Sequence, residues 1–296
     1  MKLHNIIIDT DPGIDDALAI GLALYSPKIN VKLITTVHGN VSLEKTTYNA
    51  CVLREFFNVD TPIAVGESKP LLRGQEGCLA HGISGMDGYI FNAPEKKVLA
   101  IPAVEAIREL LVNSEVPIKL VAMGPLTNIA ILIQTYPEIE ENIDELVIMG
   151  GSLVGGNITE HAEFNFWADP HAAKLVMDSS IRKTVVGLDV TSQALVTDKE
   201  LLAGKNKSSG MFKKTFKYYD DGNLIEGVWM HDSCTIALLC EKDIFTFEDK
   251  TVDIVVSGAS EGAMIEREDG ALISYAVAID SDKFKSWVVS VLKRLP

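Results

Sequence analysis

Cysteine is scarce in this sequence, and its few copies form no motif. The 296 residues include four cysteines, and no two of them have the spacing of a zinc-binding or redox motif. A chain of this length can bury enough apolar surface to fold without disulfides. We therefore expect free thiols in a reducing compartment.

Long apolar runs are also missing from the start of the chain. The first apolar run begins within a few residues of Met1 and already ends at Asp9. Such a run is too short for a signal peptide or a membrane-spanning helix. We therefore expect a cytoplasmic protein with no membrane partner.

Basic residues are outnumbered, 27 to 41, by acidic residues, and the formal net charge is -14. Proteins that bind nucleic acids neutralise phosphates with clustered lysine and arginine. The charge balance therefore argues against a nucleic-acid partner. It fits a small neutral substrate, or a cation held by carboxylates.

Strand-like and helix-like segments alternate along the whole chain. Apolar, β-branched runs predict strands at 6–8, 31–37, 62–65, 118–122, 145–149, 184–188, 252–256 and 271–278. Helices are predicted at 14–25, 42–57, 102–112, 126–134, 170–177, 199–203, 208–219 and 232–239. Buried strands separated by helices are typical of a mostly parallel sheet flanked by helices. With no repeat or linker, we expect residues 1–296 to form a single α/β domain.

Carboxylates and amides follow several of the predicted strands. In open parallel sheets, ligands bind beyond the carboxyl ends of the strands, so these residues are candidates for one site. In chain order they are Asp9, Asp11, Asp15, Asp16, Gly39, Asn40, the segment 123–128, Asn157, His161, Glu163, Asn165, His231 and Asp232.

Four of these candidates are aspartates within eight residues. Asp15 and Asp16 are favoured at the start of a helix by roughly 0.3–1 kcal/mol each, but this does not explain Asp9 and Asp11. Packed carboxylates repel unless solvent, hydrogen bonds or a cation offsets their charge. A hard cation such as calcium takes oxygen ligands of this kind, so the cluster predicts a metal site.

Two other aspartate motifs compete with this interpretation. An EF-hand loop beginning at Asp9 fails, because the sixth position is Ile14 instead of glycine and the twelfth is Ile20 instead of glutamate. The Asp9-Thr10-Asp11 order superficially fits a haloacid-dehalogenase-like phosphatase. A magnesium-dependent phosphatase with Asp9 as its nucleophile therefore remains an alternative.

Six sequence blocks resemble the inosine–uridine preferring nucleoside hydrolase family. They read DTDPGIDDA at 9–17, HGISGMDG at 81–88, GPLTNIA at 124–130, MGG at 149–151, EFN at 163–165 with ADP at 168–170, and HD at 231–232. The blocks follow the family order, and the chain length is typical of the family.

The resemblance implies the nucleoside hydrolase fold and a ribonucleoside N-ribohydrolase that releases ribose and a purine or pyrimidine base. It implies a calcium ion held by Asp11, Asp16, Asp232 and the backbone carbonyl of Met123. A calcium-bound water activated by Asp11 would attack the anomeric carbon of the ribose. Relatives of this kind are usually homodimers or homotetramers. A non-catalytic nucleoside-binding protein with the same pocket remains a further alternative.

The remaining candidate residues would contact the nucleoside. By the resemblance, the ribose would be held by Asp15, Asn40, Asn157, Glu163 and Asn165. His81 and His231 would lie near the base or its leaving nitrogen, with His231 as a catalytic residue. Tyr219, in the polar stretch 205–222, is predicted to close over the substrate.

Overall fold

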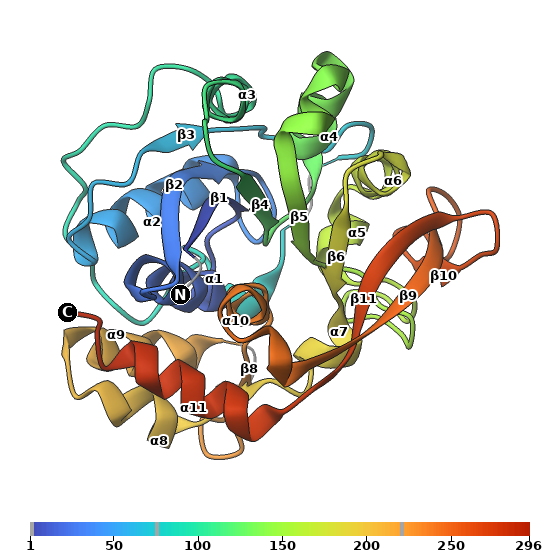
Figure 1. Ribbon diagram of the computed structural model, residues 1–296. Helices are drawn as coiled ribbons and strands as arrows, with labels where there is room; N and C mark the ends of the chain where they lie inside the picture. Colours follow the sequence, from blue (N-terminus) through green and yellow to red (C-terminus); the bar gives the residue numbers. More distant parts are fainter. Residues whose placement is uncertain (1–2, 75–76, 220–221) are drawn as a thin grey trace.

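The computed structural model describes residues 3–74, 77–219 and 222–296. Its centre is a nine-stranded sheet in the order β10-β9-β11-β6-β5-β4-β1-β2-β3 (Figure 1). The strands are β1 (His4–Thr10), β2 (Ile29–Thr36), β3 (Ile63–Val65), β4 (Ile118–Ala122), β5 (Ile143–Met149), β6 (Lys183–Val186), β9 (Phe245–Ile254), β10 (Met264–Glu266) and β11 (Ala271–Ile279). A separate ribbon pairs β7 (Leu195–Val196) with β8 (Val228–Trp229).

The strands from β3 to β11 in this order run parallel, and only β9 and β10 add antiparallel pairs. The direction in which strands are added to the sheet reverses between β1 and β4. Strands β2 and β3 lie on one side of β1, and β4 and the strands of this sheet that follow it lie on the other side. Ligands bind at such a switch point in doubly wound sheets.

Helices cover both faces of the sheet (Figure 1). They are α1 (Ile14–Tyr25), α2 (Leu43–Phe56), α3 (Ala103–Val112), α4 (Thr127–Thr135), α5 (Phe164–Ala168), α6 (Pro170–Asp178), α7 (Leu188–Thr191), α8 (Asp198–Leu201), α9 (Lys207–Thr215), α10 (Ser233–Cys240) and α11 (Ser281–Leu292). Short 3-10 turns occupy Leu79–His81, Pro137–Asn142, Leu202–Gly204, Phe216–Tyr218 and Lys242–Ile244.

Each face of the sheet carries its own hydrophobic core. Ile6 and Ile8 of β1 pack into one core with α1, α2, α9, α10 and α11, whereas Ile7 packs into the other with α3, α4 and α6. Successive side chains of a strand point to opposite faces, and all three isoleucines are fully buried. A short run of consecutive apolar residues therefore marks a strand covered on both sides.

The predicted α/β fold with a mostly parallel sheet is confirmed. The predicted strand 252–256 proves to be the end of the longer, antiparallel β9, and the helix predicted at 208–219 ends at Thr215. Sequence reasoning missed α11, β10 and the β7–β8 ribbon. In the described part of the chain, no helix is both long and apolar enough to cross a membrane.

Candidate active site

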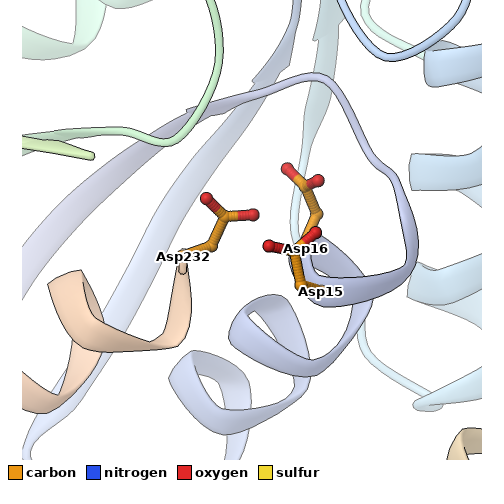
Figure 2. A group of neighbouring side chains, drawn as sticks. All are labelled: Asp15, Asp16 and Asp232. Carbon is orange, nitrogen blue, oxygen red and sulfur yellow. The ribbon is translucent and has the colours of Figure 1, made fainter. Parts of the chain in front are cut away.

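Three carboxylates meet where α1 and α10 begin. Asp15 and Asp16 lie in the first turn of α1, and Asp232 lies at the start of α10 (Figure 2). One oxygen atom from each lies within 4.8 Å of the others, and all three side chains are buried. The two helices pack against each other, so aspartates more than 200 residues apart share one space.

Asp11 lies beside this group in a narrow cradle. Its Oδ2 accepts a hydrogen bond from the Asn40 backbone N–H at 2.7 Å, whereas Oδ1 is buried and has no hydrogen-bond partner among the described residues. Gly39 and Gly124 border the carboxylate so closely that a Cβ on Gly124 would lie 2.6 Å from Oδ1. A buried carboxylate oxygen without a partner is costly, and a cation would satisfy it.

Hydrogen bonds orient Asp16 at the helix start. Its Oδ1 accepts from the Thr10 hydroxyl, and its Oδ2 accepts from the Gly13 backbone N–H at 2.9 Å and from Asn40 Nδ2 at 3.3 Å. Asn40 Nδ2 also donates to the Asp11 backbone carbonyl at 3.2 Å. Asn40 therefore ties together the two aspartates that the resemblance assigns to the metal.

Burial and mutual repulsion raise the pKa values of the carboxylates in the cluster. Burial, and then repulsion from Asp16, raises the pKa of Asp15 to about 8. The pKa values of Asp11 and Asp232 are also well above the usual range, first because of burial and then because of the neighbouring carboxylates. A bound cation would reverse this shift by favouring the ionised forms. Carboxylates together with the Met123 carbonyl form a donor set suited to a hard cation.

Above the cluster lies a cavity of about 550 Å³, within the usual size range of ligand pockets. Ten of the residues singled out from the sequence line it, although they come from distant parts of the chain. They are Asp15, Asn40, His81, Met123, Asn157, Glu163, Asn165, Tyr219, His231 and Asp232. Asp11 and Asp16 lie beneath the wall and do not line it.

The segment before α5 contributes polar groups to one side of the cavity. Glu163 is the N-cap of α5: Oε1 accepts from the Asn165 N–H at 2.9 Å, and Oε2 accepts from Gly151 N–H at 2.9 Å. Burial raises the pKa of Glu163 to about 7. Asn165 Nδ2 donates to the Met123 carbonyl at 3.1 Å, and Asn157 Oδ1 caps this segment by accepting from the Phe164 N–H at 2.9 Å.

His81 enters the cavity in a defined tautomer. Its Nδ1 accepts a hydrogen bond from the Ile14 backbone N–H at 3.0 Å, so the proton of the neutral ring lies on Nε2. Burial, together with nearby His231, lowers the pKa of His81 to about 3. The ring packs against Tyr219, with centroids 5.0 Å apart, and Tyr219 hydrogen-bonds to Asp15.

His231 immediately precedes Asp232 and is also neutral. Its Nδ1 lies 2.7 Å from the Thr191 hydroxyl, and burial lowers the pKa of the ring to about 4. Tyr219 belongs to the polar stretch 205–222, of which residues 220 and 221 lie outside the described residues. Tyr219 itself is buried against Phe216 and already lies in the cavity wall.

Sequence reasoning missed several residues of the cavity wall. Asp189 lines the cavity just after β6, so the strand-end argument that found Asn40 applies to it equally. Ser152 and Leu188 also line the cavity. The sequence does mark Trp229 as a bulky residue beside the site residue His231, and the structure places it in the cavity wall. What the sequence does not signal is the β7–β8 ribbon that carries it, because each strand is two residues long.

Comparison with known proteins places this architecture in one class, the nucleoside hydrolases. Residues 6–286 match the inosine-uridine preferring nucleoside hydrolase family. The non-specific ribonucleoside hydrolase RihC of Salmonella schwarzengrund is 45% identical over 304 residues, covering 100% of this chain and 99% of the relative. The corresponding protein of Salmonella typhi has the same identity and coverage.

Solved structures agree with the sequence comparison. A purine-preferring ribonucleoside hydrolase from Gardnerella vaginalis superposes with a TM-score of 0.90 at 26% identity, covering 98% of this chain and 99% of that chain. A plant nucleoside hydrolase superposes with the same TM-score and coverage at 27% identity.

The chain therefore belongs to the inosine-uridine preferring nucleoside hydrolase family. It is an enzyme that hydrolyses the N-glycosidic bond of small-molecule nucleosides. The family depends on a metal, and the described residues of this chain include an aspartate cluster that could bind one.

Proposed function

We propose that the protein is a calcium-dependent ribonucleoside hydrolase that accepts both purine and pyrimidine nucleosides. The observation that carries this proposal is the Asp11 carboxylate, whose buried Oδ1 has no hydrogen-bond partner among the described residues and lies beside the cluster of Asp15, Asp16 and Asp232. Relatives named non-specific ribonucleoside hydrolase, at 45% identity over the full chain, support the breadth of substrates.

The residues proposed to hold calcium are Asp11, Asp16, Asp232 and, through its backbone carbonyl, Met123. Bound there, calcium supplies positive charge that keeps these carboxylates ionised and makes a water molecule easier to deprotonate. Calcium is a weaker Lewis acid than zinc and polarises the water less. Removal of the proton from the water therefore depends mostly on the Asp11 carboxylate.

Asp11 is proposed to remove the proton from the attacking water. A base that contacts the water directly contributes about 10²–10⁴-fold in rate. Oδ1 is the atom available for this role, because no described residue hydrogen-bonds to it, whereas Oδ2 accepts from the Asn40 N–H. Attack on the anomeric carbon passes through an oxocarbenium-like sugar, as in related glycoside hydrolysis.

Polar groups in the cavity wall are proposed to hold the ribose hydroxyls. These groups are Asp15, Asn40, Asn157, Glu163 and Asn165. The carboxylates and amides are fixed by hydrogen bonds to the protein, and Asn40, for example, has both N–H groups of its amide engaged by Asp11 and Asp16. Such preorganised groups lower the cost of distorting the sugar toward the transition state.

Two neutral histidines are proposed to serve the departing base. The His81 Nε2–H is free of the Ile14 contact and can donate to the base. His231 would donate a proton to the leaving nitrogen of the base. The Thr191 hydroxyl would orient the His231 ring through its contact with Nδ1. Tyr219 would close the substrate against His81.

The phosphatase alternative requires Asp9 as the nucleophile. Asp9 is fully buried, and its carboxylate interacts with Thr35 and Asn128, whereas the Asp11 carboxylate interacts with Asp15 and Asp16 of the cluster. Asp9 Oδ1 accepts from the Thr35 hydroxyl at 2.5 Å and from Asn128 Nδ2 at 2.7 Å, and burial raises the pKa of Asp9 to about 6. These contacts support a role for Asp9 in joining β1, β2 and α4.

The test is turnover of inosine, uridine and cytidine, measured as reducing sugar released with calcium present and after chelation. We expect ribose from all three nucleosides, loss of activity on chelation, and recovery when calcium is returned. Asp11→Asn should keep the fold and lose most activity. Binding of nucleosides without ribose release would favour a non-catalytic protein, and near-normal turnover by Asp11→Asn would exclude this residue as the base.

We further propose that residues 1–296 act as one domain, assembled as a homodimer or homotetramer in the cytoplasm. The unpaired thiols of Cys51, Cys234 and Cys240 support a reducing compartment. Light scattering coupled to size-exclusion chromatography measures the assembly.

A further inference from the structure

Trp229 occupies an unusual place for a large apolar side chain. It lines the cavity, and 40% of its surface remains exposed. The other two tryptophans are engaged elsewhere: the Arg73 guanidinium lies 4.0 Å from the Trp167 ring centroid, and Trp287 is buried against Phe284. An exposed aromatic face on a cavity wall is typical of a ligand contact.

The β7–β8 ribbon fixes the direction in which Trp229 points. Trp229 pairs with Leu195 across the ribbon, and the next N–H, of Met230, donates to the Ala194 carbonyl at 3.0 Å. Val228 and Met230 are both buried, so strand alternation turns Trp229 to the opposite side, toward the cavity. The indole is therefore presented by a hydrogen-bonded backbone and not by a loose loop.

The neighbour of Trp229 defines what would contact it. The centroid of the Trp229 ring lies 6.2 Å from that of His231, and the two planes are 34° apart. In the proposed function, on which this inference rests, His231 serves the nitrogen that leaves the ribose. The base is bonded to the ribose through that nitrogen and extends away from the buried aspartates, toward this more exposed part of the wall.

Two further apolar side chains line the cavity and are accessible to solvent. Val154 and Ile158, from the segment between β5 and α5, line the cavity and are 80% and 36% exposed. Asp189 also lines it, but its Oδ2 already accepts from the Tyr275 hydroxyl, Ser152 Oγ and the Leu153 N–H. The Trp229 ring and these exposed apolar side chains therefore offer the face of a base an apolar contact in the same cavity.

We propose that Trp229 is a specificity-determining residue that stacks on the nucleobase and lets the enzyme accept purines and pyrimidines alike. Every nucleobase has a π-face, so stacking tolerates changes in the hydrogen-bonding edge. A purine offers a larger face than a pyrimidine and gains more from the indole. Trp229 acts on substrate binding, and the proton transfers remain with His231 and Asp11.

The test compares Trp229→Ala, Trp229→Leu and Trp229→Phe with the wild type, using inosine and uridine. Loss of stacking should raise KM about 5- to 150-fold in the alanine and leucine variants, more for inosine than for uridine. Trp229→Phe retains an aromatic face and should restore most of the affinity. Tyr48→Ala removes another exposed aromatic ring, on α2 and outside the cavity, and should leave KM unchanged.

Ribose inhibition separates stacking from a general disturbance of the site. Ribose has no base, so its inhibition constant should be the same in the wild type and all Trp229 variants. Equal weakening of ribose inhibition, an unchanged KM in Trp229→Leu, or a loss confined to kcat would overturn the stacking role. Failure of the wild type to release ribose from either nucleoside would instead overturn the proposed function itself.

Discussion

Replacing Gly39 with alanine should disable the enzyme by crowding Asp11. A Cβ at this position would overlap Asp11 Oδ2 and lie 2.7 Å from its Cγ and 2.9 Å from Pro125 Cδ. The φ angle of Gly39 is outside the left-handed region, so its backbone can accept an L side chain without strain. The expected effect is therefore steric and acts on the carboxylate.

The crowded atoms have little freedom to move away. The Asn40 N–H holds Asp11 Oδ2 at 2.7 Å, and Gly124 closes the other side of the carboxylate. Overpacking of this kind costs about 1–3 kcal/mol of unfolding free energy. A displacement of about 1 Å in a reacting group costs on the order of 100-fold in kcat. Activity should therefore suffer more than stability.

Gly210→Ala is the matched control for this substitution. A Cβ there meets no atom of the described residues within 4 Å, and the residue lies inside α9, where alanine should stabilise the protein by about 0.5–1 kcal/mol. Ribose release measures kcat for both variants, and thermal unfolding measures their stability. Turnover by Gly39→Ala equal to that of Gly210→Ala would refute the assignment of a tight, functional cradle around Asp11.

Three further predictions concern the rest of the fold. Lys119→Met should lower the free energy of unfolding, measured in urea, by about 3–5 kcal/mol, because it removes the lysine that pairs with the buried Glu145 carboxylate. Adding Glu145→Leu should restore most of this loss. A double variant that is as unstable as Lys119→Met would contradict the pairing. Burial lowers the pKa of His38 from 6.5 to about 4, so the unfolded chain binds a proton that the folded protein does not. Stability present above pH 6.5 should therefore fall by up to about 3 kcal/mol as the pH drops toward 4, and His38→Gln should flatten that part of a urea-denaturation series; an unchanged slope would argue against His38. Tyr275→Phe removes the 2.5 Å hydrogen bond to Asp189 and should cost about 1–3 kcal/mol while raising KM, because Asp189 also holds the start of the segment that carries Asn157; melting and kinetics identical to wild type would refute this link.

The central sheet was predictable because its strands are buried on both faces. Runs such as Ile6–Ile8 and the strand 118–122 consist of apolar residues flanked by helical patterns, and the structure places strands there. The outer strand β9 was only partly found, because its exposed positions interrupt the apolar run with charged residues. A sheet edge with one solvated face leaves a weaker signal than a covered centre.

Helix α11 was missed although its pattern is present in the sequence. Phe284, Trp287, Val288 and Val291 recur at three- and four-residue spacings, and all four are buried against the sheet and α1 side of the molecule. Asp280 caps the helix by accepting from the Lys283 N–H at 3.1 Å. This periodicity is sufficient to predict a helix, so the sequence does contain the information that specifies α11.

The linear order of residues is sufficient for the fold class, the family and the chemical types in the site. Apolar runs, strand ends and the aspartate-rich segment each occupy a few neighbouring positions, and such local patterns are visible without a structure. This is why Asp11, Asp15 and Asp16 stand out together as carboxylates suited to a cation.

Only the folded chain decides which of these groups touch and how they titrate. Asp232 meets Asp15 across more than 200 residues, Asn40 joins Asp11 to Asp16, and the β7–β8 ribbon presents Trp229 to the cavity. Contacts of this range depend on the order of strands and the packing of helices, which no short pattern encodes. Burial, which raises the pKa of Asp15 to about 8, exists only once these elements have closed around it.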